Sequence, residues 1–121
     1  MIVHKLNQQK NPERVIVIGG SGFIGRRVVK DLLAVNVPVV SMSSKDVDLT
    51  KVSSRNILLY KFKSTDVVIL LSALTPEKTD SGIQEIERFQ KNLTMLENLC
   101  WVLAQTSIKQ LVAAINSRAA R

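Results

Sequence analysis

Three glycines, each three residues from the next, could hold an anion at the start of a helix. Residues 19–25 read Gly-Gly-Ser-Gly-Phe-Ile-Gly, which places Gly19, Gly22 and Gly25 in a G-x-x-G-x-x-G pattern. In such a loop Gly19 permits a sharp turn, Gly22 lets a phosphate approach the backbone, and Gly25 lets the helix pack closely on the preceding strand. Unpaired N–H groups and the helix dipole then attract the anion. The pattern favours a pyrophosphate site for a dinucleotide, with a ligand-free tight turn as the alternative.

The elements around this loop are those that a dinucleotide site requires. Residues 15–20 are a short apolar run that ends in glycine, which is typical of a strand buried on both faces of a parallel sheet. Apolar residues recur at helical spacing over residues 23–33, and β-branched residues over 37–40 predict a second strand. Residues 15–40 therefore form a β-α-β unit. A P-loop is excluded, because no Gly-Lys-Ser/Thr follows the glycines.

The rest of the chain continues the alternation of strands and helices. We expect a short helix within residues 50–64, with a strand over 57–60 as the alternative. A buried strand over 66–73, a long helix over 81–106 and a last strand over 111–115 follow. The predicted fold class is α/β, a Rossmann-like parallel sheet with flanking helices that is incomplete at about four to five strands.

The long helix carries two apolar stripes. The first contains Ile86, Phe89, Leu93, Leu96, Cys100 and Leu103, and the second contains Met95, Leu99 and Val102. Because a helix that is apolar on two faces needs two partners, we expect one stripe to pack on the sheet and the other on a second chain. The pattern predicts a homodimer through residues 81–106.

The glycine loop resembles the cofactor loop of the extended short-chain dehydrogenases/reductases, the NAD(P)-dependent epimerases, dehydratases and reductases of sugar nucleotides. Asp48 and Leu49 match the acidic-apolar pair that lies along the adenine ring in this family. Residues 66–75 resemble its fourth strand, and Asn92 matches an asparagine in its following helix, which commonly builds a dimer interface. The resemblance implies a cofactor site formed by Gly19, Ser21, Gly22, Phe23, Ile24, Gly25, Ser41, Ser43, Ser44, Lys45, Asp48, Leu49, Leu71, Ser72, Ala73 and Asn92.

The end of the second strand bears on which dinucleotide is preferred. An NAD site places a carboxylate there to bind the ribose hydroxyls, but the position near Ser41 holds no acid. The hydroxyls of Ser43 and Ser44 and the ammonium of Lys45 suit a 2′-phosphate better. We therefore predict NADP as the preferred cofactor and NAD as the alternative. The nearby acidic residue Asp46 is an argument against this preference.

The family's catalytic residues have no counterpart in this sequence. The resemblance implies a tyrosine with a lysine four residues later, yet the single tyrosine, Tyr60, is followed at that distance by Ser64. We assign no catalytic residue and expect a truncated reductase- or epimerase-like domain that binds NAD(P) and is inactive alone. Residues 1–14 are interpreted as a loose lead-in, 15–112 as the binding domain and 113–121 as a divergent tail that need not be native. The alternative is a dimeric scaffold or interaction module that has kept the fold without the ligand.

Composition limits the other classes of function. The net charge is +7, and residues 1–63 carry 11 basic against 4 acidic residues, but stacking aromatics and a basic helix are missing, which disfavours nucleic acid. One cysteine, Cys100, and one histidine, His4, exclude a disulfide framework and a Cys/His zinc site. No apolar run is long enough to span a membrane and no secretory signal is visible, so the expected location is cytoplasmic.

Overall fold

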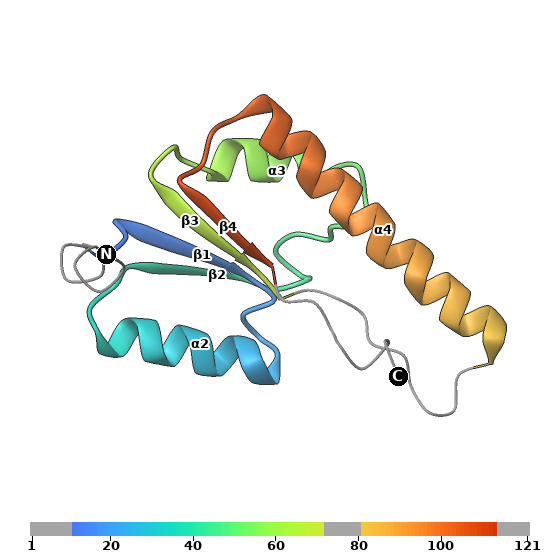
Figure 1. Ribbon diagram of the computed structural model, residues 1–121, viewed down its shortest axis with the longest axis horizontal. Helices are drawn as coiled ribbons and strands as arrows, with labels where there is room; N and C mark the ends of the chain where they lie inside the picture. The colour runs from blue at the N-terminus through green and yellow to red at the C-terminus, as the bar shows by residue number, and fades with distance from the viewer. Residues whose placement is uncertain (1–10, 72–80, 114–121) are drawn as a thin grey trace, which may run out of the picture.

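The computed structural model describes residues 11–71 and 81–113, which fold into alternating strands and helices (Figure 1). In chain order the elements are β1 (Arg14–Ile18), α2 (Phe23–Ala34), β2 (Val39–Met42), α3 (Ser54–Lys61), β3 (Asp66–Leu70), α4 (Gly82–Gln105) and β4 (Gln110–Ala113). The order of elements confirms the α/β prediction, including the short helix before the third strand.

The predicted boundaries are displaced by a few residues. β1 ends at Ile18 rather than at residue 20, because Gly19 turns the chain out of the sheet with a φ of 96°. β2 runs from Val39 to Met42, two residues later than expected. β3 ends at Leu70, so the predicted strand over 66–73 extends too far by at least Leu71, and its residues 72 and 73 lie outside the described residues. The predicted lead-in up to residue 10 and the predicted tail from residue 114 also lie outside them.

The described strands form one parallel sheet in the order β2-β1-β3-β4. Val17 of β1 lies opposite Ser41 of β2 on one side and Ile69 of β3 on the other. Because all four strands are parallel, their carboxyl ends share one edge of the sheet, where the turn into α2 and the loop after β2 both leave it (Figure 1).

Helices cover both faces of the sheet, α2 on one face and α3 with α4 on the other (Figure 1). Alternate residues of β1 point to opposite faces, so Ile16 and Ile18 pack toward α3 and α4, while Val15 and Val17 pack toward α2. This explains why the first strand is an unbroken apolar run. The loop after β2 also contributes Val47 and Leu49 to the core beneath α3 and α4.

An ion pair joins β1 to β3 at the amino edge of the sheet. Arg14 donates to the fully buried Asp66 from Nε at 2.8 Å and from Nη2 at 2.7 Å. Arg14 Nη2 also donates to the carbonyl of Lys61, and the N–H of Lys63 donates to Asp66, each at 2.8 Å. Burial raises the pKa of Asp66, but these hydrogen bonds and the nearby cations outweigh it and lower the pKa below its ordinary value.

The helix α4 begins with a capping box and is only partly covered. Gln84 N–H donates to Ser81 Oγ, and Ser81 N–H donates to Gln84 Oε1. The buried residues of α4, Asn98, Leu99 and Val102, all lie near its carboxyl end. The predicted second stripe therefore packs on the sheet.

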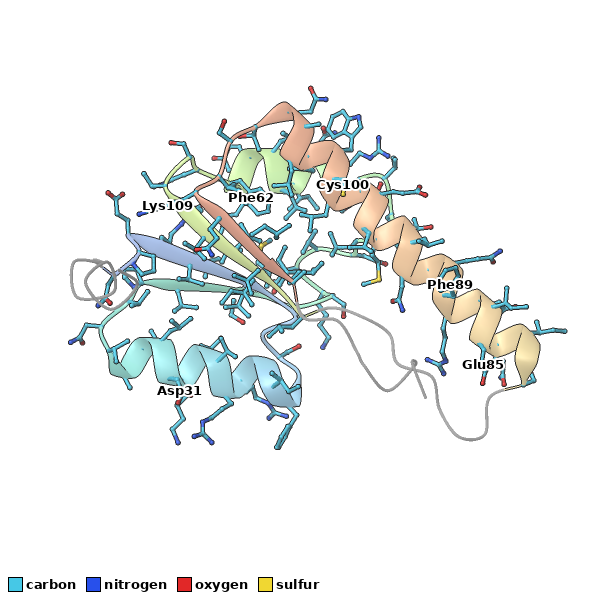
Figure 2. All side chains as sticks on the ribbon, viewed as in Figure 1. Asp31, Phe62, Glu85, Phe89, Cys100 and Lys109 are labelled. Atoms are coloured by element: carbon cyan, nitrogen blue, oxygen red, sulfur yellow. The ribbon has the colours of Figure 1, made fainter. Side chains whose placement is uncertain are left out.

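The first stripe of α4 stays largely at the surface of this chain. Its exposed apolar residues are Ile86, Phe89, Leu93 and Leu96, and Cys100, which also belongs to it, is exposed too. Phe89 is 63% exposed and lies on the part of α4 that extends beyond the sheet (Figure 2). Of the helices that the structure describes, none combines the length and apolar character that crossing a bilayer requires.

Candidate functional site

The glycine turn is held against the end of β2. The N–H of Gly19 donates to the carbonyl of Met42 at 2.8 Å, and the N–H of Gly22 donates back to the carbonyl of Gly19 at 3.2 Å. Gly19 has a left-handed φ of 96°, a conformation that side chains with a Cβ rarely adopt. The predicted role of Gly19 in the sharp turn out of the strand is therefore matched by its backbone conformation.

Gly25 and Gly22 are glycines for different reasons. A Cβ on Gly25 would collide with the carbonyl oxygen of Gly19 and with the backbone of Gly20, so the packing of α2 against the turn requires glycine there. A Cβ on Gly22 would meet only the carbonyl oxygen of Gly19, at an ordinary 3.6 Å, and its φ of −73° suits any residue. Within the described residues, nothing around Gly22 requires a glycine, so the space beside it is free for a ligand.

The start of α2 is open to an anion. Gly22 is the N-cap, its helix has no side-chain cap, and no acidic residue lies in the first turn. Ser21, Phe23 and Ile24 are exposed around this end. Backbone N–H groups at a helix start that lack a side-chain acceptor bind phosphate oxygens well, and the helix dipole adds to the attraction. The open space at Gly22 and the uncapped helix together fit a pyrophosphate group.

The strand order places this turn where ligands bind in open parallel sheets. From β1 the chain moves to β2 on one side and then crosses to β3 on the other, so the connection reverses between β1 and β3. Ligands bind in the crevice at the carboxyl ends of such strands. Leu71, a predicted cofactor contact, lies at this point, and its N–H donates to the carbonyl of Ile18 at 2.8 Å.

The residues that follow β2 form a hydrogen-bonded turn around Asp46. Its carboxylate accepts from the N–H of Ser43 at 2.8 Å and from the Ser43 hydroxyl at 3.1 Å. These hydrogen bonds lower the pKa of Asp46 below its ordinary value, so the carboxylate is ionised at neutral pH. The hydroxyl of Ser43 is thus already bound, whereas Ser44 and Lys45 are exposed.

Ser41 lies beside the glycine turn. A Cβ on Gly20 would collide with the hydroxyl of Ser41, so the two residues are in direct contact at the carboxyl edge of the sheet. The sequence-predicted residues of the glycine turn, of the end of β2 and of the end of β3 therefore share this edge. Ser72 and Ala73 lie outside the described residues, and Asn92 is half-buried on α4.

The neighbouring residues Asp48 and Leu49 lie in different environments. The carboxylate of Asp48 accepts from Thr50 Oγ1 at 2.6 Å and from the Thr50 N–H at 3.0 Å, and these bonds lower its pKa. Leu49 is 2% exposed and belongs to the core. Of the two residues, Asp48 is half-buried and Leu49 is buried.

One residue that holds the loop between β2 and α3 was not predicted from the sequence. Asn98 of α4 is buried, and its Nδ2 donates to the carbonyl of Leu49 at 2.6 Å. The signal available in the sequence was a polar residue between Met95 and Val102 on the apolar stripe that faces the sheet. Such a residue needs a buried hydrogen-bond partner.

Comparison with known proteins places these features in a family. The family model described as "NAD dependent epimerase/dehydratase family" matches residues 15–118. The UDP-glucose 4-epimerase of Thermus thermophilus, solved in complex with NAD, is 27% identical with a TM-score of 0.69 over 81% of this chain and 36% of its own. No curated protein sequence matches the chain at a significant level.

Two further solved structures share the fold at lower identity. The GDP-mannoheptose C4 reductase of Campylobacter jejuni with NADP bound is 17% identical, with a TM-score of 0.74 over 87% of this chain and 33% of its own. The GDP-L-fucose synthetase of Naegleria fowleri bound to NADP is 19% identical, with a TM-score of 0.69 over 87% of this chain and 34% of its own. This chain therefore spans about a third of the length of the structures that it matches.

Proposed function

The chain belongs to the NAD dependent epimerase/dehydratase family, and on that premise we propose that it binds NAD or NADP at the carboxyl edge of its sheet. The observation that carries the proposal is Gly22, a glycine with open space beside it at the uncapped start of α2. The pyrophosphate would lie there against the first turn of α2. Asp48 and residues 41–45 would hold the adenosine half, and Leu71 would lie toward the nicotinamide half.

The nicotinamide ring of the bound dinucleotide would accept or supply a hydride, and the tyrosine of this sequence does not match the family's proton donor. Its single tyrosine, Tyr60, is 93% exposed on α3 and has Ser64, not lysine, four residues later. We therefore propose that the chain binds the dinucleotide without turning over a substrate by itself. Sugar nucleotides are the substrate class named by the matched structures.

The preference between the two dinucleotides depends on the turn after β2. The hydroxyls of Ser43 and Ser44 and the ammonium of Lys45 favour the 2′-phosphate of NADP. The carboxylate of Asp46 opposes it, since it already occupies both donors of Ser43 and repels a phosphate. A preference for NADP therefore requires Ser44 and Lys45 to outweigh Asp46.

We also propose that the protein is a cytoplasmic homodimer. The exposed apolar face of α4, formed by Ile86, Phe89, Leu93 and Leu96, supports association with a second copy, because isolated apolar residues are ordinary at a surface but a continuous stripe is not. This face is separate from the glycine turn. A dimeric scaffold without a ligand is therefore the second candidate function, and it would keep the dimer while binding no dinucleotide.

Thermal unfolding with and without ligand tests the proposed function. A ligand that binds only the native state raises the melting temperature, so NADH or NADPH should stabilise the wild-type protein. Gly22→Ala should remain folded and lose this effect, because its Cβ would occupy the space that the pyrophosphate needs. Gly82→Ala is the matched control, since Gly82 also begins a helix with open space around it. Stabilisation of Gly22→Ala equal to that of the wild type would refute this placement of the pyrophosphate.

A further inference from the structure

Asn98 is a buried amide with three hydrogen-bond partners from one segment of the chain. It is 3% exposed, and its Nδ2 donates to the carbonyl of Leu49 at 2.6 Å and to that of Lys51 at 3.3 Å. Its Oδ1 accepts from Nε of Arg55 at 2.9 Å. All three partners belong to the loop between β2 and α3 or to the first turn of α3, so Asn98 ties α4 to that loop.

The segment that Asn98 holds is a tight turn around Asp48. The N–H of Lys51 donates to the carbonyl of Asp48 at 3.0 Å. The hydroxyl and the N–H of Thr50 both donate to the carboxylate of Asp48. These bonds are all internal to residues 48–51, so they fix the shape of the turn but not its place on the protein. The amide of Asn98 and the buried side chain of Leu49 fix the place.

This turn belongs to the loop that leaves the sheet beside the glycine turn. Met42, the last residue of β2, accepts from the N–H of Gly19, and the chain reaches Asp48 six residues later. The ionised carboxylate of Asp48 is a hydrogen-bond acceptor, and the exocyclic amino group of adenine is a donor of matching chemistry. Hypoxanthine carries a carbonyl oxygen in place of that amino group. This oxygen is itself an acceptor, so it would repel the carboxylate of Asp48 instead of donating to it.

We propose that Asn98 is a positioning residue that places the carboxylate of Asp48 at the adenine end of the dinucleotide site and so makes the site selective for adenine. The inference rests on the proposed function, because it assumes a dinucleotide with its pyrophosphate at Gly22. Asparagine is suited to the role because one side chain donates to two carbonyls and accepts from Arg55. Leucine of similar size would fill the space and leave the buried carbonyl of Leu49 without a partner.

The variant Asn98→Asp separates positioning from packing. It keeps the volume of the side chain and its acceptor for Arg55, but it replaces the group that donates to Leu49 and Lys51 with an oxygen that repels their carbonyls. Ser54→Ala is the matched control, since Ser54 is equally buried next to Arg55 and its hydroxyl has no hydrogen-bond partner within the described residues. If Asn98→Asp does not fold, Asn98→Ser, which is smaller and uncharged, carries the same comparison.

The experiment measures selectivity rather than affinity alone. Each protein is titrated with NAD and with nicotinamide hypoxanthine dinucleotide, and the ratio of the two dissociation constants is compared. We expect the wild type and Ser54→Ala to prefer NAD by about tenfold, as a hydrogen bond to a charged group provides, and Asn98→Asp to bind both within about twofold. If Asn98 has a structural role only, its substitution would weaken the binding of both dinucleotides equally and leave the ratio of their dissociation constants unchanged.

The outcomes distinguish the inference from the proposed function. A folded Asn98→Asp protein that keeps the wild-type ratio would overturn the positioning role alone. Wild-type protein that binds both dinucleotides equally would overturn the placement of Asp48, and the inference with it, while the pyrophosphate site would stand. Folded wild-type protein that binds neither of these dinucleotides would overturn the inference, and if it also fails to bind NADP it would overturn the proposed function as well.

A spectroscopic readout of the same network comes from Trp101. The guanidinium of Arg55 lies 4.9 Å from the centroid of the Trp101 ring, and this is the single tryptophan of the chain. Removing the amide acceptor for Arg55 in Asn98→Ser should therefore shift the tryptophan emission of the free protein, whereas Ser54→Ala should not. An unchanged emission spectrum in folded Asn98→Ser would contradict the proposed link between Asn98 and Arg55.

Discussion

The carbonyl oxygen of Gly19 faces the α-carbon of Gly25 so closely that no side chain can be added to Gly25. The turn out of β1 and the first turn of α2 are therefore packed backbone against backbone. This contact brings the start of the helix against the carboxyl end of β1, and it leaves Gly22 as the member of the pattern that faces open space. Two of the three glycines thus build the turn, and the third leaves room at it.

We predict that Gly25→Ala destabilises the protein. The atoms around the added Cβ belong to the backbone of Gly19 and Gly20 and cannot rotate away, so the helix must shift. Overpacking of this kind costs about 1–3 kcal/mol. Chemical denaturation of the variant beside Gly82→Ala measures the difference, and equal free energies of unfolding would contradict the close packing at Gly25.

The ion pair of Arg14 and Asp66 predicts acid sensitivity. Because the native pKa of Asp66 is lowered, the pair contributes stability above the ordinary carboxyl pKa of about 3.9, and this contribution is lost as the pH falls through the native pKa. Asp66→Asn should lose about 3 kcal/mol at neutral pH, and its stability should fall less steeply in acid. Denaturation at several pH values checks this, and parallel curves for the two proteins would contradict it.

Ser54→Ala should be at least as stable as the wild type. The hydroxyl of Ser54 is fully buried and has no hydrogen-bond partner within the described residues, so burying it has an uncompensated desolvation cost. Alanine removes that cost and favours the helix α3, with an expected gain of about 1 kcal/mol. The melting temperature reports the change, and a clear fall would show that the hydroxyl has a partner in solution.

The local patterns of the sequence predicted the fold and the glycine turn because their physical causes are local. The apolar run of β1 reflects a strand covered on both faces, and the glycine spacing reflects a turn closed within seven residues. The order of the elements follows from this alternation. The hydrogen bond from the Ser43 N–H to the carboxylate of Asp46 is also local, because the two residues are only three positions apart.

Features that depend on contacts between distant parts of the chain could not be predicted from local sequence patterns. The partners of Asn98 lie 43 to 49 residues away in the chain, so no local spacing reveals them. Leu49 matches a family position beside the adenine ring, but its burial depends on packing beneath α3 and α4. Periodicity showed two apolar stripes on the long helix, yet it did not indicate that the stripe with Met95 and Leu99 would be the one against the core.

The exposed stripe of α4 predicts that a charge on it disrupts a dimer. Phe89→Glu places a carboxylate at the centre of this face, so we expect a dimeric wild-type protein to become at least tenfold weaker in association, a change of about 1.4 kcal/mol or more. Gln90→Glu adds the same charge one residue away and serves as the control. Sedimentation velocity at several concentrations measures the association, and a monomeric wild type would contradict the proposed interface.

The most direct test of the dinucleotide site is a calorimetric titration of the purified, folded wild-type protein with NADH and with NADPH. We predict saturable binding of at least one of them with one site per chain, and loss of that binding in Gly22→Ala but not in Gly82→Ala. Tighter binding of NADPH would show that Ser44 and Lys45 outweigh Asp46, and tighter binding of NADH the reverse. Binding of neither dinucleotide by the folded wild type would contradict the proposed site and favour a scaffold that has kept the fold without the ligand.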